Sequence, residues 1–294
     1  FSHHFDIMLD DAASPVSIVF NGVAHFGTHN LTANTDGSIL FLSGSDLSFS
    51  DGDISLTAVN ATDGLAARKG ISIVEGKITT TGSGDILLNG TGSSAVGLND
   101  MDGVYLDFNA QIASTSTSAN AGTITLNGTS GVGKDFAAGL QIKNSTITSS
   151  MGAIQLTGVG GGGSGHSHYG ISIHTSLVES TGTGIDAATI VLDGTGGVAE
   201  SWGVGLGIFN DTIVRSVDGD IAWIGRGAAG TFGNNVGIKT GEFTLESTGV
   251  GANAAKISVQ GIGGSGTNSN AGASLEGDNS VIRSVDGAIS LLGD

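Results

Sequence analysis

A short pattern returns along this chain: glycine or alanine, any residue, isoleucine, any residue, and then usually leucine. From Ile86 onward, a glycine always stands four residues after the isoleucine. Self-similarity at a period of about 20–50 residues is typical of stacked repeat architectures. The isoleucines of the pattern are Ile39, Ile54, Ile86, Ile124, Ile154, Ile190, Ile221, Ile257 and Ile289, and the glycines are Gly90, Gly128, Gly158, Gly194, Gly225, Gly261 and Gly293. The chain is therefore expected to stack repeated units.

Two further apolar columns run in step with the first one. Around each column, apolar and polar residues alternate between clusters of Gly, Ser, Thr, Asn and Asp, which is the pattern of short strands. One column contains Ile73, Leu106, Ile142, Ile173, Ile208, Ile238 and Leu275, and the other contains Ile78, Ile112, Ile147, Val178, Val214, Leu245 and Ile282. Each unit thus offers three strands, and almost no helix is predicted.

The units alternate in length. The spacing from the last of these columns to the pattern isoleucine is 8 residues at Ile78–Ile86 and then alternates between 12 and 7. The segments "RSVDGDIAWIG" and "RSVDGAISLLG" therefore repeat 68 residues apart, as the same short unit in successive pairs. The super-repeat is about 67 residues long, and the longer units should project from one corner near Ala119–Ala121, Ile185–Ala187 and Gly251–Ala254.

A unit of about 33 residues with three strands cannot bury its apolar side alone, so successive units must stack. The predicted fold is all-β: a right-handed parallel β-helix with one coil per unit, about 4.8 Å between coils, and ladders of like side chains inside. Glycines at the corners are expected to supply the positive φ angles of tight turns. The alternative is two coils of about 17 residues per unit, because Ile39 and Ile54 are only 15 residues apart.

The regular repeats cover residues 70–294, and residues 1–69 differ from them in composition and in the regularity of the repeat. The first 29 residues contain the only proline, Pro15, together with four of the seven histidines. We expect residues 1–69 to form irregular first coils or a segment that covers the end of the solenoid, where strand edges would otherwise be unpaired.

Composition excludes several classes of function. Ten Lys and Arg stand against 27 Asp and Glu, which gives a net charge of −17 and no basic stripe for a nucleic acid. No apolar run approaches the 18 or so residues of a transmembrane segment. The chain has no cysteine, which excludes disulfides, thiolate nucleophiles and cysteine-bound zinc.

Pairs of aspartates at predicted turns are candidate calcium ligands, since calcium prefers six or more oxygen ligands. The competing interpretation is turn chemistry, because Asp tolerates and caps tight bends. The candidates are Asp51, Asp53, Asp100, Asp102, Asp218 and Asp220. No other cofactor is predicted.

Histidines form a second candidate metal site, for zinc or copper. The segment "GHSHYG" places His166 and His168 on one face of an extended segment, and His174 follows nearby. The N-terminal histidines are His3, His4, His25 and His29. The competing interpretation is a solvated loop beside the glycine-rich "GVGGGGSG".

An enzyme acting on polysaccharides, a lyase or a glycoside hydrolase, is the alternative to a structural role. Such chemistry needs two or three carboxyl groups clustered on adjacent coils. The residues that precede the pattern isoleucines are Ser38, Asp53, Asp85, Thr123, Ala153, Thr189, Asp220, Lys256 and Ala288, with no neighbouring acidic pair after Asp85. The sequence therefore predicts a protein that is not an enzyme.

Segments such as "TTTGSGDILLNGTG", "STSANAGTITLNGTSG" and "STGTGIDAATIVLDGTGG" resemble the β-helical repeats of large bacterial surface proteins. The similar families are the filamentous-haemagglutinin-like proteins and the autotransporter passengers, over about residues 70–294. The resemblance implies an exported, elongated adhesin or fibre component and identifies no catalytic residue.

We therefore expect a structural component of an extracellular bacterial surface fibre whose copies join head to tail. The final segment "SVDGAISLLGD" lies in the middle of a unit, so its strand edges should be continued by the first coil of another copy, through residues 1–27. The alternative is a monomeric adhesin stalk that binds surface glycans. Partners are thus copies of the chain, other cell-surface components or glycans.

Overall fold

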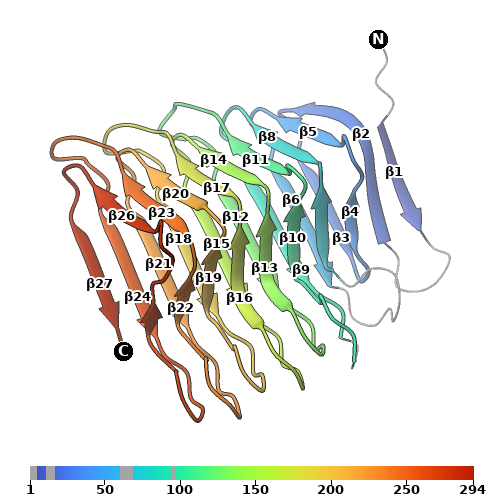
Figure 1. Cartoon of the computed structure of the whole chain (residues 1–294). Helices are drawn as coiled ribbons and strands as arrows, with labels where there is room; N and C mark the ends of the chain where they lie inside the picture. The colour runs from blue at the N-terminus through green and yellow to red at the C-terminus, as the bar shows by residue number, and fades with distance from the viewer. Residues whose placement is uncertain (1–4, 11–16, 60–68, 95–96) are drawn as a thin grey trace.

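The computed structural model describes residues 5–10, 17–59, 69–94 and 97–294, and these residues form strands and no helix. The strands stack along one axis, from the N-terminal end at β1 to the C-terminal end at β27 (Figure 1). Within the described part, there is accordingly no helix long and apolar enough to cross a membrane. The prediction of an all-β fold is confirmed.

Three sheets, here named A, B and C, run the length of the solenoid. Sheet A contains β1 (Phe5–Asp10), the first part of β2 (Ser17–Gly27), β4 (Ile39–Phe41), β7 (Ile71–Val74), β10 (Val104–Asp107), β13 (Ala137–Lys143), β16 (His168–His174), β19 (Leu206–Phe209), β22 (Ile238–Thr240) and β25 (Ala273–Ser274). Sheet B contains the second part of β2, β5 (Asp46–Phe49), β8 (Lys77–Thr80), β11 (Gln111–Ser114), β14 (Thr146–Ser149), β17 (Leu177–Ser180), β20 (Thr212–Ser216), β23 (Phe243–Ser247) and β26 (Val281–Ser284). Sheet C contains β3 (Leu31–Thr35), β6 (Ile54–Val59), β9 (Ile86–Thr91), β12 (Ile124–Thr129), β15 (Ile154–Val159), β18 (Ile190–Thr195), β21 (Ile221–Arg226), β24 (Ile257–Ile262) and β27 (Ile289–Gly293).

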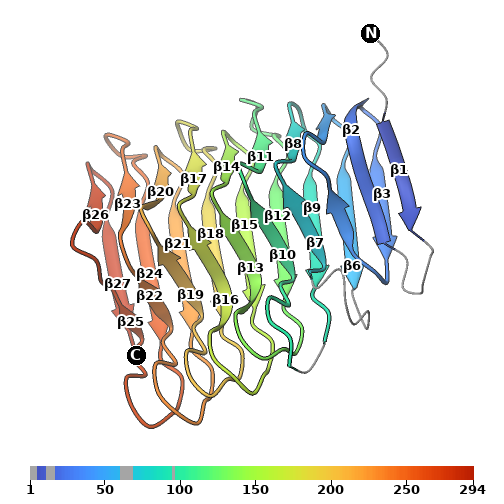
Figure 2. The ribbon, with the colours of Figure 1, turned by 45° about the vertical axis from the view of Figure 1, so that its right-hand side comes forward.

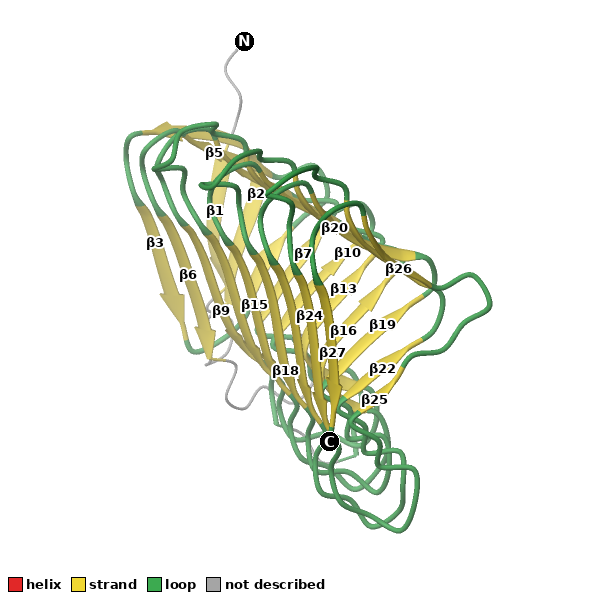
Figure 3. Ribbon diagram, turned by 90° about the vertical axis from the view of Figure 1, so that its left-hand side faces the viewer, coloured by secondary structure: helices red, strands yellow, loops and turns green. Residues whose placement is uncertain are grey.

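Each coil contributes one strand to sheet A, then one to B, then one to C, and the coils repeat at about 32 residues. Seen from the C-terminal end, sheet C descends on the left, sheet A rises on the right and sheet B crosses the top (Figure 3). The chain circles counter-clockwise as it advances toward the viewer, so the coil is right-handed. Except for the antiparallel β1–β2 pair, neighbouring strands are parallel, as predicted.

One unit forms one coil, so the alternative of two short coils per unit is wrong. Ile39, assigned from the pattern to the same column as Ile54, lies in sheet A and pairs with Ile71. The residue that stacks on Ile54 in sheet C is Leu31. The 15-residue spacing thus separates two sheets of one coil rather than two coils.

The predicted isoleucine ladder forms the inner face of sheet C. Consecutive members pair directly, Ile86 with Ile124 and so on to Ile257 with Ile289. All but the last are at most 1% exposed, whereas Ile289 in the final coil is 43% exposed. Burying such a side chain contributes roughly 1.5–3 kcal/mol, so this ladder is a main source of stability.

The column from Ile78 to Ile282 pairs throughout sheet B, as predicted. The sheet A column is correct from Ile73 to Ile208 but wrong after it. Ile238 stacks on Leu206, and Thr240 takes the position beside Ile208. The chain enters β22 two residues away from the position that the repeat predicts. The prediction for Leu275 is wrong as well, because the residue that pairs with Ile238 in the next coil is Ala273.

The recurring glycines mark the place where sheets C and A nearly touch. A Cβ atom added at Gly128 would lie 1.9 Å from the carbonyl oxygen of Gly139, and one at Gly158 would lie 2.1 Å from that of Gly170. The same approach, within 2.2 Å, occurs at Gly90, Gly194, Gly225 and Gly261. We call this line of contact the glycine waist.

The positive φ angles expected of corner glycines occur at Gly44, Gly184 and Gly251, with φ of 81°, 86° and 81°. The waist glycines recur along the coils for a different reason. None of the waist glycines has a positive φ, and what excludes a side chain there is the facing backbone. Positive φ angles also occur between sheets A and B, at Glu75, Asn109, Asn144 and Thr175, for example. Asn is comparatively tolerant of this conformation, which accounts for part of the set.

Beyond the waist, the segments from sheet C to sheet A extend outward as stacked loops (Figure 2). Isolated parallel bridges join these loops from coil to coil, at Gly133 with Gly163 and Ala199 with Gly230, for example. The loop stack has an interior of its own that contains Met101, His168 and Asn235, all fully buried. Asn235 is well satisfied there: its Oδ1 accepts from Gly203 N at 3.0 Å, and its Nδ2 donates to Ser265 O at 2.8 Å.

The long units project from a single corner, between sheets B and C, on every second coil. Their tips form similar turns: the backbone N–H of Ala121, Ala187 and Ala254 donates to the carbonyl three residues earlier, at 2.9, 3.2 and 3.2 Å. The predicted ridge is therefore present, with coils that repeat at about 9.6 Å along the axis.

Two contacts explain why "RSVDG" occurs twice. Asp218 Oδ2 accepts from Gly184 N at 2.6 Å, and Asp286 Oδ2 accepts from Gly251 N at 2.7 Å. In each case the aspartate of a short coil holds the long turn of the preceding coil. The arginines act in the same direction, because Arg215 pairs with Glu179 at 2.6 Å and Arg283 binds Glu246. The repeated motif thus couples each short coil to the long coil before it.

At the N-terminal end, β2 to β6 already belong to the same three sheets as the later strands. β1 lies outside β2 and pairs with it antiparallel, from Phe5 opposite Gly22 to Asp10 opposite Ser17. Residues 17–59 therefore contribute regular coils, and β1 adds a strand that lies along one end of sheet A.

Replacing Gly158 with alanine should destabilise the protein by about 2–3 kcal/mol, because the new Cβ meets the Gly170 backbone. Gly162→Ala is the matched control, since a Cβ at Gly162 has no atom within 4 Å. Urea unfolding followed by circular dichroism measures both variants. Equal stability of the two variants would contradict the waist as a steric constraint.

Replacing Asp218 with alanine should accelerate amide hydrogen exchange at Gly184 by about five- to tenfold, because one charged hydrogen bond is lost. Asp218→Asn retains an acceptor oxygen and should restore most of the protection. Asp186→Ala, at the exposed tip of the same turn, is the control. If Asp186→Ala changes the exchange as much as Asp218→Ala, Asp218 does not hold the turn.

Candidate binding surface

The outward side chains of sheet A form two rows across neighbouring coils. Register places Tyr105, Gln141, Ser172, Gly207 and Lys239 in the first row. It places Lys143, His174 and Phe209 in the second row. Their inward neighbours fill the core, so alternation along each strand directs these side chains outward. Aromatic, cationic and amide groups therefore gather on one side of the solenoid.

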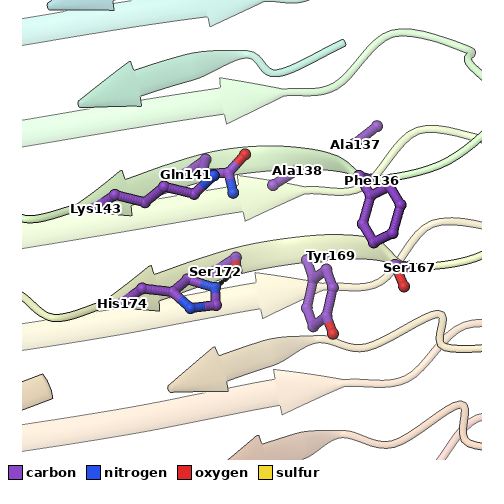
Figure 4. A pocket seen from close by; sticks show the side chains of 9 residues that line it. All are labelled: Phe136, Ala137, Ala138, Gln141, Lys143, Ser167, Tyr169, Ser172 and His174. Carbon is purple, nitrogen blue, oxygen red and sulfur yellow. Dashed lines mark hydrogen bonds between the residues drawn. The ribbon is translucent and has the colours of Figure 1, made fainter. Parts of the chain in front are cut away.

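A cavity of about 220 Å³ lies on this side of sheet A and is lined from β13, β16 and the segments just before them. Phe136 and Tyr169 lie at one end, Lys143 and His174 lie at the other, and Gln141 and Ser172 lie between them (Figure 4). We call this cavity the sheet A cleft. Lys143 follows Ala138 by five positions along the strand, so the cleft is roughly 16 Å long in the strand direction.

The aromatic end of the cleft is held open by backbone conformation. Phe136 is 58% exposed and has a φ of 56°, an uncommon combination for a bulky residue. Its N–H donates to His166 O at 3.1 Å, which fixes the strained residue in place. Nearby, Tyr169 meets Phe209 edge to face at 6.2 Å. Burial raises the pKa of Tyr169 to about 12, so the phenol keeps its proton.

His174 is neutral in this environment. Burial, and then the charge of Lys143, lower the pKa of His174 to about 4. Asn210 Nδ2 lies 3.3 Å from His174 Nδ1, and Ser172 Oγ lies 2.9 Å from Nε2. Because an amide nitrogen can only donate, Nδ1 is the acceptor and Nε2–H donates to Ser172. The hydroxyl proton of Ser172 is then available to a group in the cleft.

One coil toward the N-terminus, a buried ion pair supports the same surface. Asp102 is fully buried; Lys69 Nζ lies 3.4 Å from Asp102 Oδ2, and Ala138 N donates to Oδ1 at 3.0 Å. With its amide oriented to satisfy its neighbours, Gln141 donates to both Asp102 oxygens at 3.1 Å and accepts from Lys143 Nζ at 2.9 Å. Burial raises the pKa of Asp102 to about 6, against the opposing effect of Lys69.

Tyr105 connects this ion pair with the cleft. Lys69 Nζ lies 4.3 Å from the centre of the Tyr105 ring and Lys143 Nζ lies 5.7 Å from it, within the range of cation–π attraction. The Tyr105 hydroxyl donates to Asp107, and burial together with that carboxylate raises the Tyr105 pKa. The surface as a whole offers aromatic faces, ammonium groups and hydrogen-bond donors.

The six aspartates predicted as calcium ligands lie in three separate places. Five of them have carboxylates that accept backbone N–H groups: Asp51 from Ser83 at 3.0 Å, Asp53 from Asp85 at 2.9 Å, Asp102 from Ala138 at 3.0 Å, Asp218 from Gly184 at 2.6 Å, and Asp220 from Lys256 at 2.8 Å. Asp102 is the partner of Lys69, and Asp100 has a positive φ of 62° beside it. The structure therefore provides the turn-forming role for these residues, and calcium binding stays a prediction.

The predicted histidine sites are dispersed. His168 is buried, with Nε2 3.1 Å from Lys134 O in the preceding coil, whereas His166 Nδ1 lies 2.7 Å from Ser201 Oγ in the following coil. His29 contacts Phe26 O at 3.1 Å, and His3 and His4 lie outside the described residues. Among the described residues, no three His, Cys, Asp or Glu side chains group as metal ligands.

The prediction for the residues that immediately precede the sheet C isoleucines in sequence is wrong at one position. The register puts Asn30 rather than Ser38 at the first position, and Asn30 Oδ1 accepts from Asp53 N at 2.8 Å. Asp53, Asp85 and Asp220 in this row likewise accept backbone N–H groups from the next coil. These carboxylates bind neighbouring coils together.

Sequence reasoning missed Tyr105, Gln141, Lys143 and His174 as members of one surface. Each stands next to a residue of the Ile73–Ile208 column, so the column predicts that they point outward. A comparison of these outward positions from unit to unit would have found the two rows.

Comparisons with protein-family models, with curated proteins and with solved structures gave no match to this chain.

The free energy of unfolding should depend on Asp102 in the acid range. Its folded pKa of about 6 lies above the unfolded value of about 3.9, so the folded state favours the protonated form. The contribution of Asp102 to the free energy of unfolding is therefore largest below about pH 4. It falls by about 2–3 kcal/mol as the pH rises through about 6. Urea unfolding of wild type and Asp102→Asn between pH 4 and 7 measures it.

The difference in stability between wild type and Asp102→Asn should shift in favour of wild type as the pH falls. Asp186→Asn, an exposed carboxyl replaced in the same way, provides the control. A difference that is constant from pH 4 to 7 would contradict the raised pKa.

Proposed function

We propose that this chain is a non-enzymatic structural component of an extracellular bacterial surface fibre. The observation that carries the proposal is the unbroken register of the coils. Each sheet C strand from β6 to β24 pairs with one neighbour on each side, in the same register. A fold of this kind extends along one axis without a step that closes it.

The strand edges at the two ends of sheet C support end-to-end joining. Sheet C begins at β3 and finishes at β27, and both outer edges lack a partner strand in the described chain. Leu291 is 55% exposed at one edge, although its partner Val259 is 1% exposed. A further coil in the same register covers these side chains, and in the proposed fibre that coil belongs to the next copy.

The two edges are compatible in length and pattern. β27 covers Ile289–Gly293 and β3 covers Leu31–Thr35, and both are five residues long. Continuation of the ladder sets Leu31 on Ile289 and Ala33 on Leu291, apolar on apolar. Because β1 occupies the β2 edge of sheet A, the join depends mainly on sheet C.

A monomeric adhesin stalk that binds surface glycans is the second candidate. The observation that favours it is the sheet A cleft, which lies on the side of the solenoid and is independent of its ends. Partners at the cell surface and an extracellular location belong to both proposals.

If copies join through sheet C, the chain should form filaments with an axial repeat of roughly 40 Å, the length of nine coils. The double variant Ile289→Lys with Leu291→Lys places two charges on the exposed edge and should remain a monomer. Negative-stain microscopy and sedimentation velocity measure both.

Ile185→Lys is the matched control, because Ile185 is 90% exposed on the corner ridge rather than at an end. It should form filaments like wild type. A wild-type chain that remains a monomer at high concentration would refute the fibre and favour the stalk. A double variant that still forms filaments would show that the copies do not join through sheet C.

A further inference from the structure

The sheet A cleft combines features that select a particular class of ligand. Three of the ten basic residues of a chain with net charge −17 lie against aromatic rings on this side of the solenoid. Lys69 and Lys143 flank Tyr105, and Lys239 lies 5.1 Å from the Trp202 ring. Cations are thus concentrated on a face of a strongly acidic molecule.

Lys143 is the cation that remains available to a ligand. Lys69 pairs with Asp102 and Lys239 pairs with Glu276 at 3.2 Å. Among the described residues, no carboxylate lies within 4.0 Å of Lys143 Nζ; the Gln141 amide oxygen accepts from it at 2.9 Å, and Asp107 interacts with it only at longer range. An anionic group at this end of the cleft would gain a charge-assisted hydrogen bond without breaking an ion pair.

The rest of the cleft suits a ring that bears hydroxyl groups. Phe136 and Tyr169 present apolar ring surface at the far end, and Ser172 and Gln141 offer polar groups between them and Lys143. Ser172 is 2% exposed and its hydroxyl proton is free to donate, since His174 Nε2–H supplies the other hydrogen bond. Apolar walls with a few fixed polar groups are typical of small-molecule sites.

We propose that the sheet A cleft binds an acidic glycan, with a uronate carboxylate on Lys143 and a sugar ring against Phe136 and Tyr169. Ser172 donates to a ring hydroxyl of the bound sugar. The site lies on the side of the coils, so it is independent of the proposed fibre.

Titration with trigalacturonate, followed by calorimetry and NMR chemical shifts, tests the site. The methyl ester of the same trisaccharide is the matched probe, because it retains the rings and hydroxyls but lacks the charges. We expect the acid to bind at least tenfold more tightly than the ester, and its binding to weaken as salt is added. Equal binding of the two probes, or no binding of the acid at millimolar concentration, would overturn the proposal.

Variants locate the contact. Lys143→Gln should raise the Kd for the acid about tenfold and leave the Kd for the ester nearly unchanged, whereas Phe136→Ala should weaken both probes about fivefold. Lys134→Gln removes a more exposed lysine, paired with Asp135 at 3.7 Å and outside the cleft, and should change neither Kd by more than twofold. If Lys134→Gln weakens the acid as much as Lys143→Gln, the binding is non-specific attraction and the proposed site is wrong.

The Ile289→Lys, Leu291→Lys double variant separates this proposal from the fibre. It should bind the acid with the wild-type Kd whether or not wild type forms filaments. Loss of binding only in the double variant would place the ligand at the ends of the solenoid and overturn the cleft.

Discussion

The approach of sheet C to sheet A at the glycine waist sets the geometry on which the rest of the molecule depends. Facing backbones lie so close there that an added Cβ would fall about 2 Å from a carbonyl oxygen, in coil after coil. Because the two sheets converge at this contact, the core beside it is narrow and is filled mainly by ladders of Ile, Leu and Val, with Phe or Trp at a few positions. The same contact divides this core from the loop stack, through which the chain passes before it enters the sheet A strands that line the cleft.

Much of the fold follows from the sequence because parallel coils place like residues on like. Ile124 lies between Ile86 and Ile154, so a periodic isoleucine in the chain becomes a continuous ladder in space. The errors occur where two different strands look alike or where a loop changes length. Ile39 has the same neighbours in sequence as a sheet C isoleucine but lies in sheet A, and Ile238 enters its strand two residues away from the expected position.

The candidate site could not be predicted in the same way, because its residues do not repeat. Tyr105, Gln141 and Ser172 share one row, yet they have no side-chain chemistry in common. Periodicity identifies positions that stay constant, and the outer face of a solenoid is where positions vary. His168 illustrates the other limit: it is the first residue of β16, and the positive φ of Ser167 before it breaks the alternation that would have paired it with His166 on one face.

The hydrogen bonds of Asp218 and Asp286 also bear on how the molecule would respond to a pulling force. In a solenoid each coil contacts only its neighbours, so tension applied at the C-terminal end removes coils one after another. Because a short coil is hydrogen-bonded to the long turn of the coil before it, the two coils resist the pulling force together rather than one at a time. In the two pairs that carry these aspartates, force would favour release in steps of about 67 residues, each adding roughly 230 Å of extended chain. The first long coil has Met151 at the corresponding position of its short neighbour, so this coupling belongs to the C-terminal part of the solenoid.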